Sequence, residues 1–495
     1  MKQTDDLFDL VKSLKKTEKR YFKLYATRHS EEANSVKLFS AIEKMDEYDD
    51  VLLRKIFNGE KFLEQLAVAK HYLSKIILES MTLYHSESSK NLEVSHLLQQ
   101  VEFLMSKGLV EQAAKKNAKA MLIATRVENF PKLLDCFTWE RLILNKQNYK
   151  AIPNLFEKES EVLRKLNNIL EYRQLSAKVF SILKQAGRIP NELQWNEINS
   201  TLDNPLLKNV SNAYTFESKG HYFNIHAAVS FVKGDNSMTY RYTKEHVEWL
   251  EQNPLQTKLR PKSYLDSLHN YLHSCLDMNN FDELEIGLQK LKLLPNEIPY
   301  MQEPAFITFH SLDLLLRLNS GDYKKGIESV RQIEEGLEKF VNIPKTEKAI
   351  LYDRVIRLYL ADNQPIIALK WVNNILNDSG IREVRNDIVT SIKVLNILIH
   401  LELKNYDYAH YLVKSDSRVF RKNNMSSVEY IIVKNIGALP LKNKKIVPPD
   451  IKFYHKILLE LQQNNESESI PNNKNLGVST FLPTWFKNKV NQVLS

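Results

Sequence analysis

The sequence predicts an all-α protein, and three observations lead to this prediction. The 495 residues include only 12 glycines, whereas sheet proteins need glycine at hairpins and nucleotide-binding folds need it beside phosphates. Long stretches carry apolar residues at the 3.6-residue spacing of helices. Short turns also recur at a nearly constant interval, which is typical of stacked helical hairpins. We therefore expect a helical N-terminal module followed by an α-α superhelix, or solenoid, of about eight helical hairpins.

Residues 1–90 do not follow the repeat and make up the expected N-terminal module. Asp5 or Asp6 is placed to cap its first helix. The serine-rich segment 85–93 is expected to connect this module to the repeats. The expected helices of the module cover residues 7–26, 36–48, 49–57 and 62–84.

The repeats are expected between residues 94 and 421. Most turns follow an apolar pair located seven and three residues earlier, and several precede an aromatic residue by two positions and a small residue by five. This pattern indicates that one helix ends, the chain turns, and a second helix packs closely against the first. The turn centres, which are 39 to 47 residues apart, are Gly108, Gln147, Gly187, Gly234, Asn279, Gly321, Asn363 and Lys404.

The small residue after a turn is expected to lie where the two helices of a hairpin touch. Ala113, Ala368 and Ala409 occupy this position, and a short side chain there lets the backbones approach. The third repeat is the least regular, because Lys184 stands where an apolar residue is expected three positions before Gly187. We expect this repeat to be a weak joint.

The C-terminal residues 422–495 are expected to form a basic, irregular region with one or two helices. A proline-bounded basic connector comes first, and residues 451–462 are suited to a helix. The last segment is a candidate amphipathic helix led by Trp485 and Phe486. Much of the formal charge of +9 belongs here, since residues 415–495 contain 12 basic and 6 acidic side chains.

Several turns resemble the middle of a tetratricopeptide repeat. Residues 321–333 (GDYKKGIESVRQI) carry its turn glycine, an aromatic residue two positions on, a small residue five on and an apolar residue four later. Similar segments occur at 108–120, 363–372 and 404–413. The period here is about 42 residues whereas the family has 34, and the Trp and Pro positions of the family are mostly absent.

The resemblance is to a divergent, tetratricopeptide-like solenoid over about two thirds of the chain. It implies a non-catalytic scaffold whose concave helix face holds a peptide or a protein. A HEAT-type hairpin, which has a longer period, is the structural alternative.

Catalytic and cofactor-binding patterns do not stand out. Two glycines in GDYKKGIE are spaced as in a phosphate loop, but Ile327 and Glu328 stand where that loop needs Lys and Ser or Thr. His269 and His273 are four residues apart on an expected helix, yet Asn270 stands where a zinc protease has its glutamate. Acidic pairs have Lys or Arg within one helical turn, which indicates solvated ion pairs. We expect no enzyme activity, no metal and no cofactor.

The expected location is the cytoplasm. Cys136 and Cys275 are far apart in the sequence and fall within helical patterns, where a buried reduced thiol is usual. The first residues are acidic where a signal peptide is basic. The chain also lacks a run of 18 apolar residues, so we expect no membrane partner.

The leading functional prediction is an adaptor or regulator that binds a protein or peptide. Arg354 and Arg357 are three residues apart on one expected helix and are flanked by Tyr352 and Tyr359. A pair of guanidinium groups on a concave face is suited to a carboxylate or a phosphopeptide. The alternative for these residues is two arginines that hydrate a helix face.

A nucleic-acid-associated factor is the alternative function. Two basic segments would bind phosphates in that case. A loose likeness to a helix-turn-helix follows the first of them, but its would-be recognition helix is mostly apolar. The basic residues are Lys12, Lys15, Lys16, Lys19, Arg20 and Lys23 in the N-terminal helix and Lys442, Lys444 and Lys445 near the C-terminus.

Overall fold

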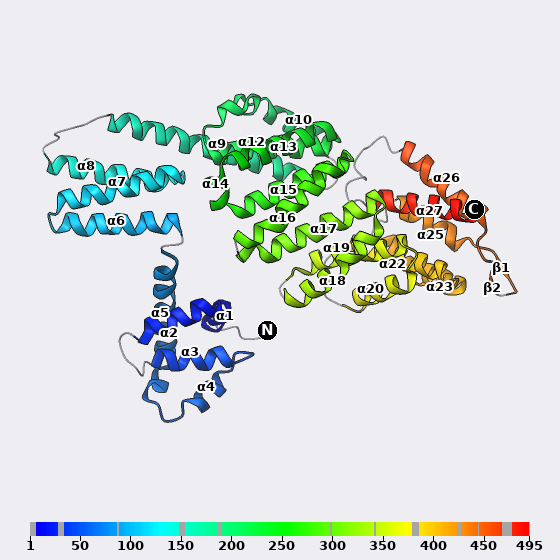
Figure 1. The fold of residues 1–495 in the computed structure, drawn as a ribbon, viewed down its shortest axis with the longest axis horizontal. Coiled ribbons are helices and arrows are strands. Elements are labelled where there is room, and N and C mark those ends of the chain that lie inside the picture. The colour runs from blue at the N-terminus through cyan, green and yellow to red at the C-terminus, as the bar shows by residue number, and fades with distance from the viewer. Residues whose placement is uncertain are drawn as a thin grey trace. The chain divides into compact units, whose positions relative to one another are not determined.

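A computed structural model shows an all-α protein. The structure describes residues 6–27, 34–86, 89–147, 154–186, 190–297, 299–340, 343–378, 386–422, 427–443, 445–467 and 478–494. Within these residues, one two-stranded sheet accompanies the helices. The fold class predicted from the sequence is therefore confirmed, and Figure 1 shows the order of the helices along the chain.

The chain divides into two compact units, Met1–Asn168 and Ile169–Ser495. This division differs from the boundaries predicted near residues 90 and 422. The first unit contains α1 (Asp6–Ser13), α2 (Lys16–Thr27), α3 (Asn34–Lys44), α4 (Asp50–Ile56), η1 (Lys61–Gln65), α5 (Leu66–Ser86), α6 (Lys90–Ser106), α7 (Val110–Arg126), α8 (Phe130–Lys146) and the start of α9 (Leu155–Ala186).

The second unit begins within α9. Its further elements up to the middle of the unit are α10 (Glu192–Leu202), α11 (Pro205–Lys208), η2 (Val210–Asn212), α12 (Phe216–Lys233), α13 (Asn236–Gln252), α14 (Pro254–Leu259), α15 (Pro261–Asp277), α16 (Phe281–Glu297) and η3 (Pro299–Met301). The remaining elements are α17 (Gln302–Ser320), α18 (Tyr323–Lys339), α19 (Lys345–Ala361), α20 (Pro365–Asn377), α22 (Asn386–Glu402), α23 (Tyr406–Ser415), α24 (Ser417–Lys422), α25 (Ser427–Gly437), β1 (Leu441–Lys442), β2 (Lys445–Ile446), α26 (Ile451–Ser467) and α27 (Val478–Leu494).

Helices α1 to α5 share a hydrophobic core of their own. Phe22 of α2 and Phe39 of α3 are fully buried, with ring centroids 4.5 Å apart. The helix predicted over 7–26 is two helices, because the side chain of Glu18 accepts from the backbone N–H of Lys15 at 2.7 Å and so begins α2 anew.

Six predicted turn centres lie where a helix ends in a left-handed residue. The φ angles are 73° at Gly108, 74° at Gly234, 55° at Asn279, 79° at Gly321, 57° at Asn363 and 60° at Lys404. At Gly108, its own N–H donates to Met105 and the next N–H, of Leu109, donates to Leu104, at 3.1 and 3.0 Å. These two bonds satisfy carbonyls that the helix end leaves free. The predicted turns are confirmed at these positions.

Helices end at or next to the predicted turn positions up to α8, after which the pattern breaks. Glu128, with a φ of 54°, separates α7 from α8, so α6, α7 and α8 lie side by side as three helices (Figure 1). The third repeat then departs from the prediction, because α9 is one helix of 32 residues. Its sequence has no glycine or proline to interrupt it. The predicted turn centre at Gly187 lies outside the described residues.

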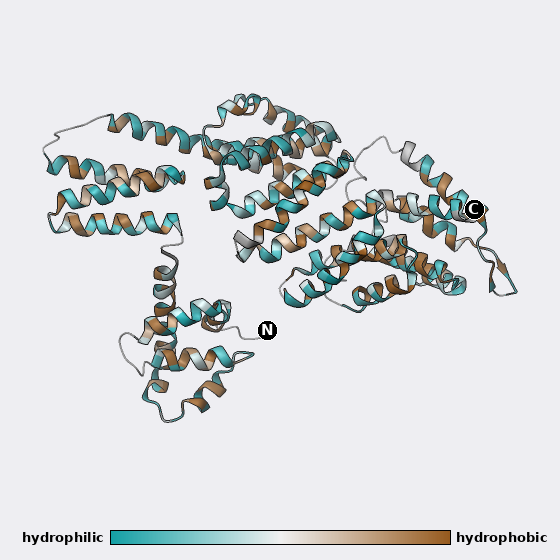
Figure 2. Ribbon diagram, viewed as in Figure 1, coloured by the Kyte–Doolittle hydropathy of each residue, from teal (hydrophilic) through white to brown (hydrophobic). Residues whose placement is uncertain are grey.

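Small residues lie at the contacts between paired helices, as predicted. Ala113, Ala368 and Ala409 are each 0% exposed. Gly326 occupies the same position after its turn, and a Cβ there would lie 3.1 Å from Cβ of Arg317 on the paired helix α17 and 2.7 Å from Cδ1 of Leu358 on α19. Figure 2 shows the hydrophobic stretches along α20 and α22, whose buried residues join the core of the second unit.

The described C-terminal helices α25, α26 and α27 contribute buried residues to that core. Phe481, Trp485 and Phe486 of α27 are buried in the same cluster as residues of α19 and α22. The Lys489 ammonium also lies 2.7 Å from the Glu402 carboxylate of α22. The apolar side chains that suggested an amphipathic helix thus face the interior.

Candidate functional site

A cavity of about 910 Å³ opens within the second unit. Its walls come mainly from α12, α15 and α19, with single contributions from α9 and α17 and two threonines of α13. Helices α12, α15, α17 and α19 are each the first helix before a predicted turn, so the cavity runs across successive first helices. We call it the first-helix groove.

The α12 side of the groove is mainly apolar. Ala227, Ala228 and Phe231 line it, and the ring of Phe231 is 39% exposed. The two alanines leave room between α12 and α15 because their side chains end at Cβ. A ligand therefore meets a hydrophobic surface on this side.

Hydroxyl groups form part of the opposite lining, and their hydrogen bonds are internal. The Thr243 and Ser274 oxygens are 2.9 Å apart, and both hydroxyls also reach backbone carbonyls of their own helices. Ser267 donates to the carbonyl of Ser263 at 2.8 Å. These contacts hold the hydroxyls in place and join α13 to α15.

Two histidines of α15 face the groove. The rings of His269 and His273 meet edge to face with centroids 4.7 Å apart. Burial lowers the pKa of His269 to about 4 and that of His273 well below its ordinary value. The charge of Arg354 contributes to both shifts. Both imidazoles are therefore neutral near pH 7.

Arg354 stands beside these histidines. It is 5% exposed and lines the groove, and its Nη1 donates to the carbonyl of Ser311 at 2.6 Å and to the Ser311 hydroxyl. Burial lowers the pKa of Arg354 to about 10, so the guanidinium still carries its charge at pH 7. The residue thus connects α19 to α17 and presents a cation to the groove.

Arg357 does not line the groove. Its side chain is 1% exposed and its Nε lies 2.8 Å from Oδ2 of Asp353. Its Nη2 also donates to Ser391 of α22 at 2.6 Å. Because these contacts occupy Arg357 inside the core, the predicted pair of binding arginines reduces to Arg354. Arg357 follows Arg354 by three residues on α19, but its side chain points into the core and not into the groove.

The groove carries charges of both signs. Arg354 and Lys262 are its cations, and Asp266, Asp277 and Glu347 are its carboxylates. Burial raises the pKa of Asp266 above its ordinary value. This balance does not favour a polyanion such as nucleic acid, which binds best where one positive sign prevails.

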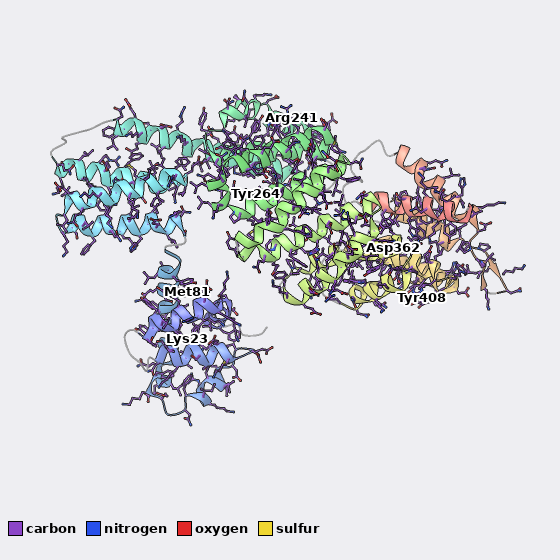
Figure 3. All side chains as sticks on the ribbon, viewed as in Figure 1. Lys23, Met81, Arg241, Tyr264, Asp362 and Tyr408 are labelled. Carbon is purple, nitrogen blue, oxygen red and sulfur yellow. The ribbon has the colours of Figure 1, made fainter. Side chains whose placement is uncertain are left out.

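The basic residues of the alternative prediction lie in different units. Lys12 donates to the Glu43 carbonyl at 2.9 Å, while Lys23, labelled in Figure 3, and Lys19 lie 2.7 and 3.5 Å from its carboxylate. Half of the basic helix face is thus directed to α3. The exposed members are Lys12, Lys15, Lys16 and Arg20 in the first unit and Lys442 and Lys445 in the second, and Lys444 lies outside the described residues.

Metal and thiol chemistry find little support in the described part of the chain. Among those residues, no group of three His, Cys, Asp or Glu side chains could hold a metal ion. Cys136 and Cys275 are buried and free, as predicted. Burial raises the pKa of each thiol to about 12, so neither is a reactive thiolate at pH 7.

Several groove residues escaped the sequence analysis. Ala227 and Phe231 are the apolar pair before the turn at Gly234, which predicted helix packing and not a ligand surface, and Ser311 has no motif of its own. The three residues meet because α12, α15, α17 and α19 follow one another in space. The four-residue spacing of His269 and His273 relates to a metal site and carries no signal of a groove. Comparison of the chain with models of protein families, with curated proteins and with solved structures finds no match. None of the described helices has the length and apolar character needed to cross a membrane.

Proposed function

We propose that this chain is a non-catalytic adaptor or regulator that binds an extended peptide segment of a partner protein in the first-helix groove. The observation that carries the proposal is the groove itself, which crosses successive first helices. Repeated helical hairpins commonly bind partners on such a surface. The resemblance of the turns to tetratricopeptide repeats supports the same proposal.

The side chains that line the groove are better suited to peptide binding than to catalysis. Phe231 and the two alanines offer apolar contact, while Arg354 and the carboxylates offer fixed polar partners. Catalytic hydroxyls are usually hydrogen-bonded to a base. Here Ser267 and Ser274 donate to backbone carbonyls, and no hydrogen bond joins a described groove hydroxyl to His269 or His273. The buried, free cysteines support a reducing compartment, which in our proposal is the cytoplasm.

Selection from a library of extended ten-residue peptides displayed on phage tests the proposal with the full-length protein. Enriched peptides are synthesised and their dissociation constants are measured against the native protein and Ala227→Trp, whose indole would fill the apolar side of the groove. Leu193→Trp is the control, because Leu193 of α10 is 80% exposed and lies outside the groove lining. Thermal unfolding verifies that both variants fold.

We expect the dissociation constant to rise at least tenfold, or about 1.4 kcal/mol, in Ala227→Trp and to stay unchanged in Leu193→Trp. Failure to enrich any peptide, or equal binding by the Ala227→Trp protein, would contradict the proposal.

A further inference from the structure

We propose that Arg354 forms an oxyanion subsite of the first-helix groove that binds the side-chain carboxylate of an acidic residue in the bound peptide. The inference rests on the proposed function and adds the chemical identity of one ligand group. The supporting observation is which buried arginines of the second unit form ion pairs with acidic side chains.

Three arginines of consecutive first helices are buried, and two of them have an acidic partner. Arg317 of α17 lies 3.0 Å from Asp313 and 2.9 Å from Glu285. Arg357 of α19 lies 2.8 Å from Asp353. In both cases the aspartate stands four residues earlier on the same helix, where an ion pair forms readily.

Arg354 is the exception. The residue four positions before it is Ile350, which itself lines the groove. Among the described residues, no carboxylate lies within ion-pair distance of its guanidinium, and its described hydrogen-bond acceptors are the two oxygens of Ser311. Nη1 makes both contacts, so the N–H groups of Nε and Nη2 remain available to donate hydrogen bonds.

Burial removes water from the Arg354 guanidinium, and this desolvation is offset best by a hydrogen-bonded counter-ion. The free donors of Arg354 form the planar fork that binds a carboxylate through two parallel hydrogen bonds. Asp353 and Glu347 act on Arg354 through their charges alone, so a ligand carboxylate would supply the hydrogen-bonded counter-ion that the described residues do not.

The neighbouring groups favour a carboxylate over a phosphate. His269 and His273 are close enough for the Arg354 charge to act on both, and a neutral imidazole can donate one N–H to an oxygen. The groove also contains Asp266, Asp277 and Glu347. One guanidinium balances a monoanion, whereas a phosphate of nearly two negative charges would be repelled by these carboxylates.

The test uses the peptides enriched on the full-length protein. Each is compared with its Glu→Gln or Asp→Asn form and with a phosphoserine form at the same position, by titration calorimetry against the native protein, Arg354→Met and Ile350→Asp. Arg331→Met is the matched control, because Arg331 of α18 is 87% exposed in its side chain and pairs with Glu335 outside the groove.

On the native protein we expect loss of the peptide charge to weaken binding roughly ten- to a hundredfold. With the Arg354→Met protein, the same change of the peptide should alter the dissociation constant less than twofold. With the Arg331→Met control, it should weaken binding as much as with the native protein. Ile350→Asp would give Arg354 the internal partner that Arg317 and Arg357 already have. That variant should stay folded and lose the preference for the charged peptide, which keeps the test valid if Arg354→Met does not fold.

Three results would overturn the subsite. Enriched peptides without an acidic residue would leave the groove as a peptide site but without this specificity. An equal loss on Arg354→Met would show that another group binds the acid. Tighter binding of phosphoserine would exclude the carboxylate as the preferred group. If no peptide is enriched, it is the proposed function that fails.

Discussion

Arg357 and Asp353 form an ion pair that is closed to solvent within α19, with Nε and Oδ2 2.8 Å apart and the side chains 1% and 8% exposed. Asp353→Ala would leave the guanidinium buried and unpaired, and we expect it to lower the free energy of unfolding by about 3–5 kcal/mol. Urea unfolding measures this loss.

The surface pair Arg331 and Glu335 is the control, since its side chains are 87% and 64% exposed. Glu335→Ala should change the unfolding free energy by less than about 1 kcal/mol. Equal effects of the two substitutions would show that the Arg357 pair contributes no more than a solvated one.

Ala368 and Ala409 should not tolerate a long or charged side chain. Both are 0% exposed at contacts between paired helices. We expect Ala368→Glu and Ala409→Glu to destabilise the protein by about 2–4 kcal/mol, because the new side chain is crowded and its charge is buried. Ile366→Glu is the control on α20, since Ile366 is 66% exposed. Unchanged melting temperatures of both alanine variants would be inconsistent with this packing.

Substitutions at two left-handed turn residues should change the stability of the protein in opposite directions. Lys404 has a φ of 60° and Gly321 a φ of 79°. Lys404→Gly should stabilise by about 1 kcal/mol because glycine has no Cβ to strain this conformation. Gly321→Ala should cost about as much, although a Cβ there meets nothing within 4 Å. Thermal unfolding measures both changes. If both substitutions shifted the melting temperature in the same direction, left-handed backbone strain could not be their cause.

Buried histidines should make the protein sensitive to acid. His246 of α13 is 3% exposed, and burial lowers its pKa from 6.5 to about 4. Between these values the unfolded chain binds the proton more tightly than the folded one, so stability is complete above pH 6.5 and falls toward pH 4. We expect His246→Met to reduce this loss by at most about 3 kcal/mol.

Urea unfolding at pH 7, 5.5 and 4.5 provides the measurement. His455→Gln serves as the control, because His455 lies on the exposed side of α26. An equal fall in stability for the native protein and His246→Met would assign the acid sensitivity to other groups.

The irregular third repeat should open more easily than the later helices. Residues 190–209 form the short helices α10 and α11, whereas α19 is buried along most of its length. Amide hydrogen exchange should be faster over the described residues 190–209 than over 356–401 where these are described. Equal protection of the two stretches would indicate one cooperative block.

The turns were predictable because they depend on local backbone chemistry. Glycine and asparagine adopt left-handed conformations readily, and the constant spacing revealed Lys404 although lysine does not favour that region. Glu128 lies in the connection between two successive hairpins, for which the pattern specifies no residue type. The break in the third repeat could have been inferred from the absence of glycine and proline in α9.

The groove was predictable only in part, since it depends on contacts between distant helices. Arg354 attracted attention by sequence, but only the packing of α17 against α19 reveals that it faces Ser311. The burial of Arg357 had a visible signal in Asp353 four residues earlier. The apolar side of α12 had a signal of another kind, because Ala227 and Phe231 are the apolar pair before Gly234 and therefore predicted core packing.

The packing of α27 has a consequence for the order in which the chain is synthesised. Trp485 and Phe486 fill a core whose other walls, α19 and α22, leave the ribosome much earlier. The apolar residues of α19 and α22 that pack against α27 therefore stay exposed to solvent until α27 has been synthesised. A nascent chain halted before Trp485 would therefore display an open hydrophobic surface, which is the feature that chaperones and proteases recognise.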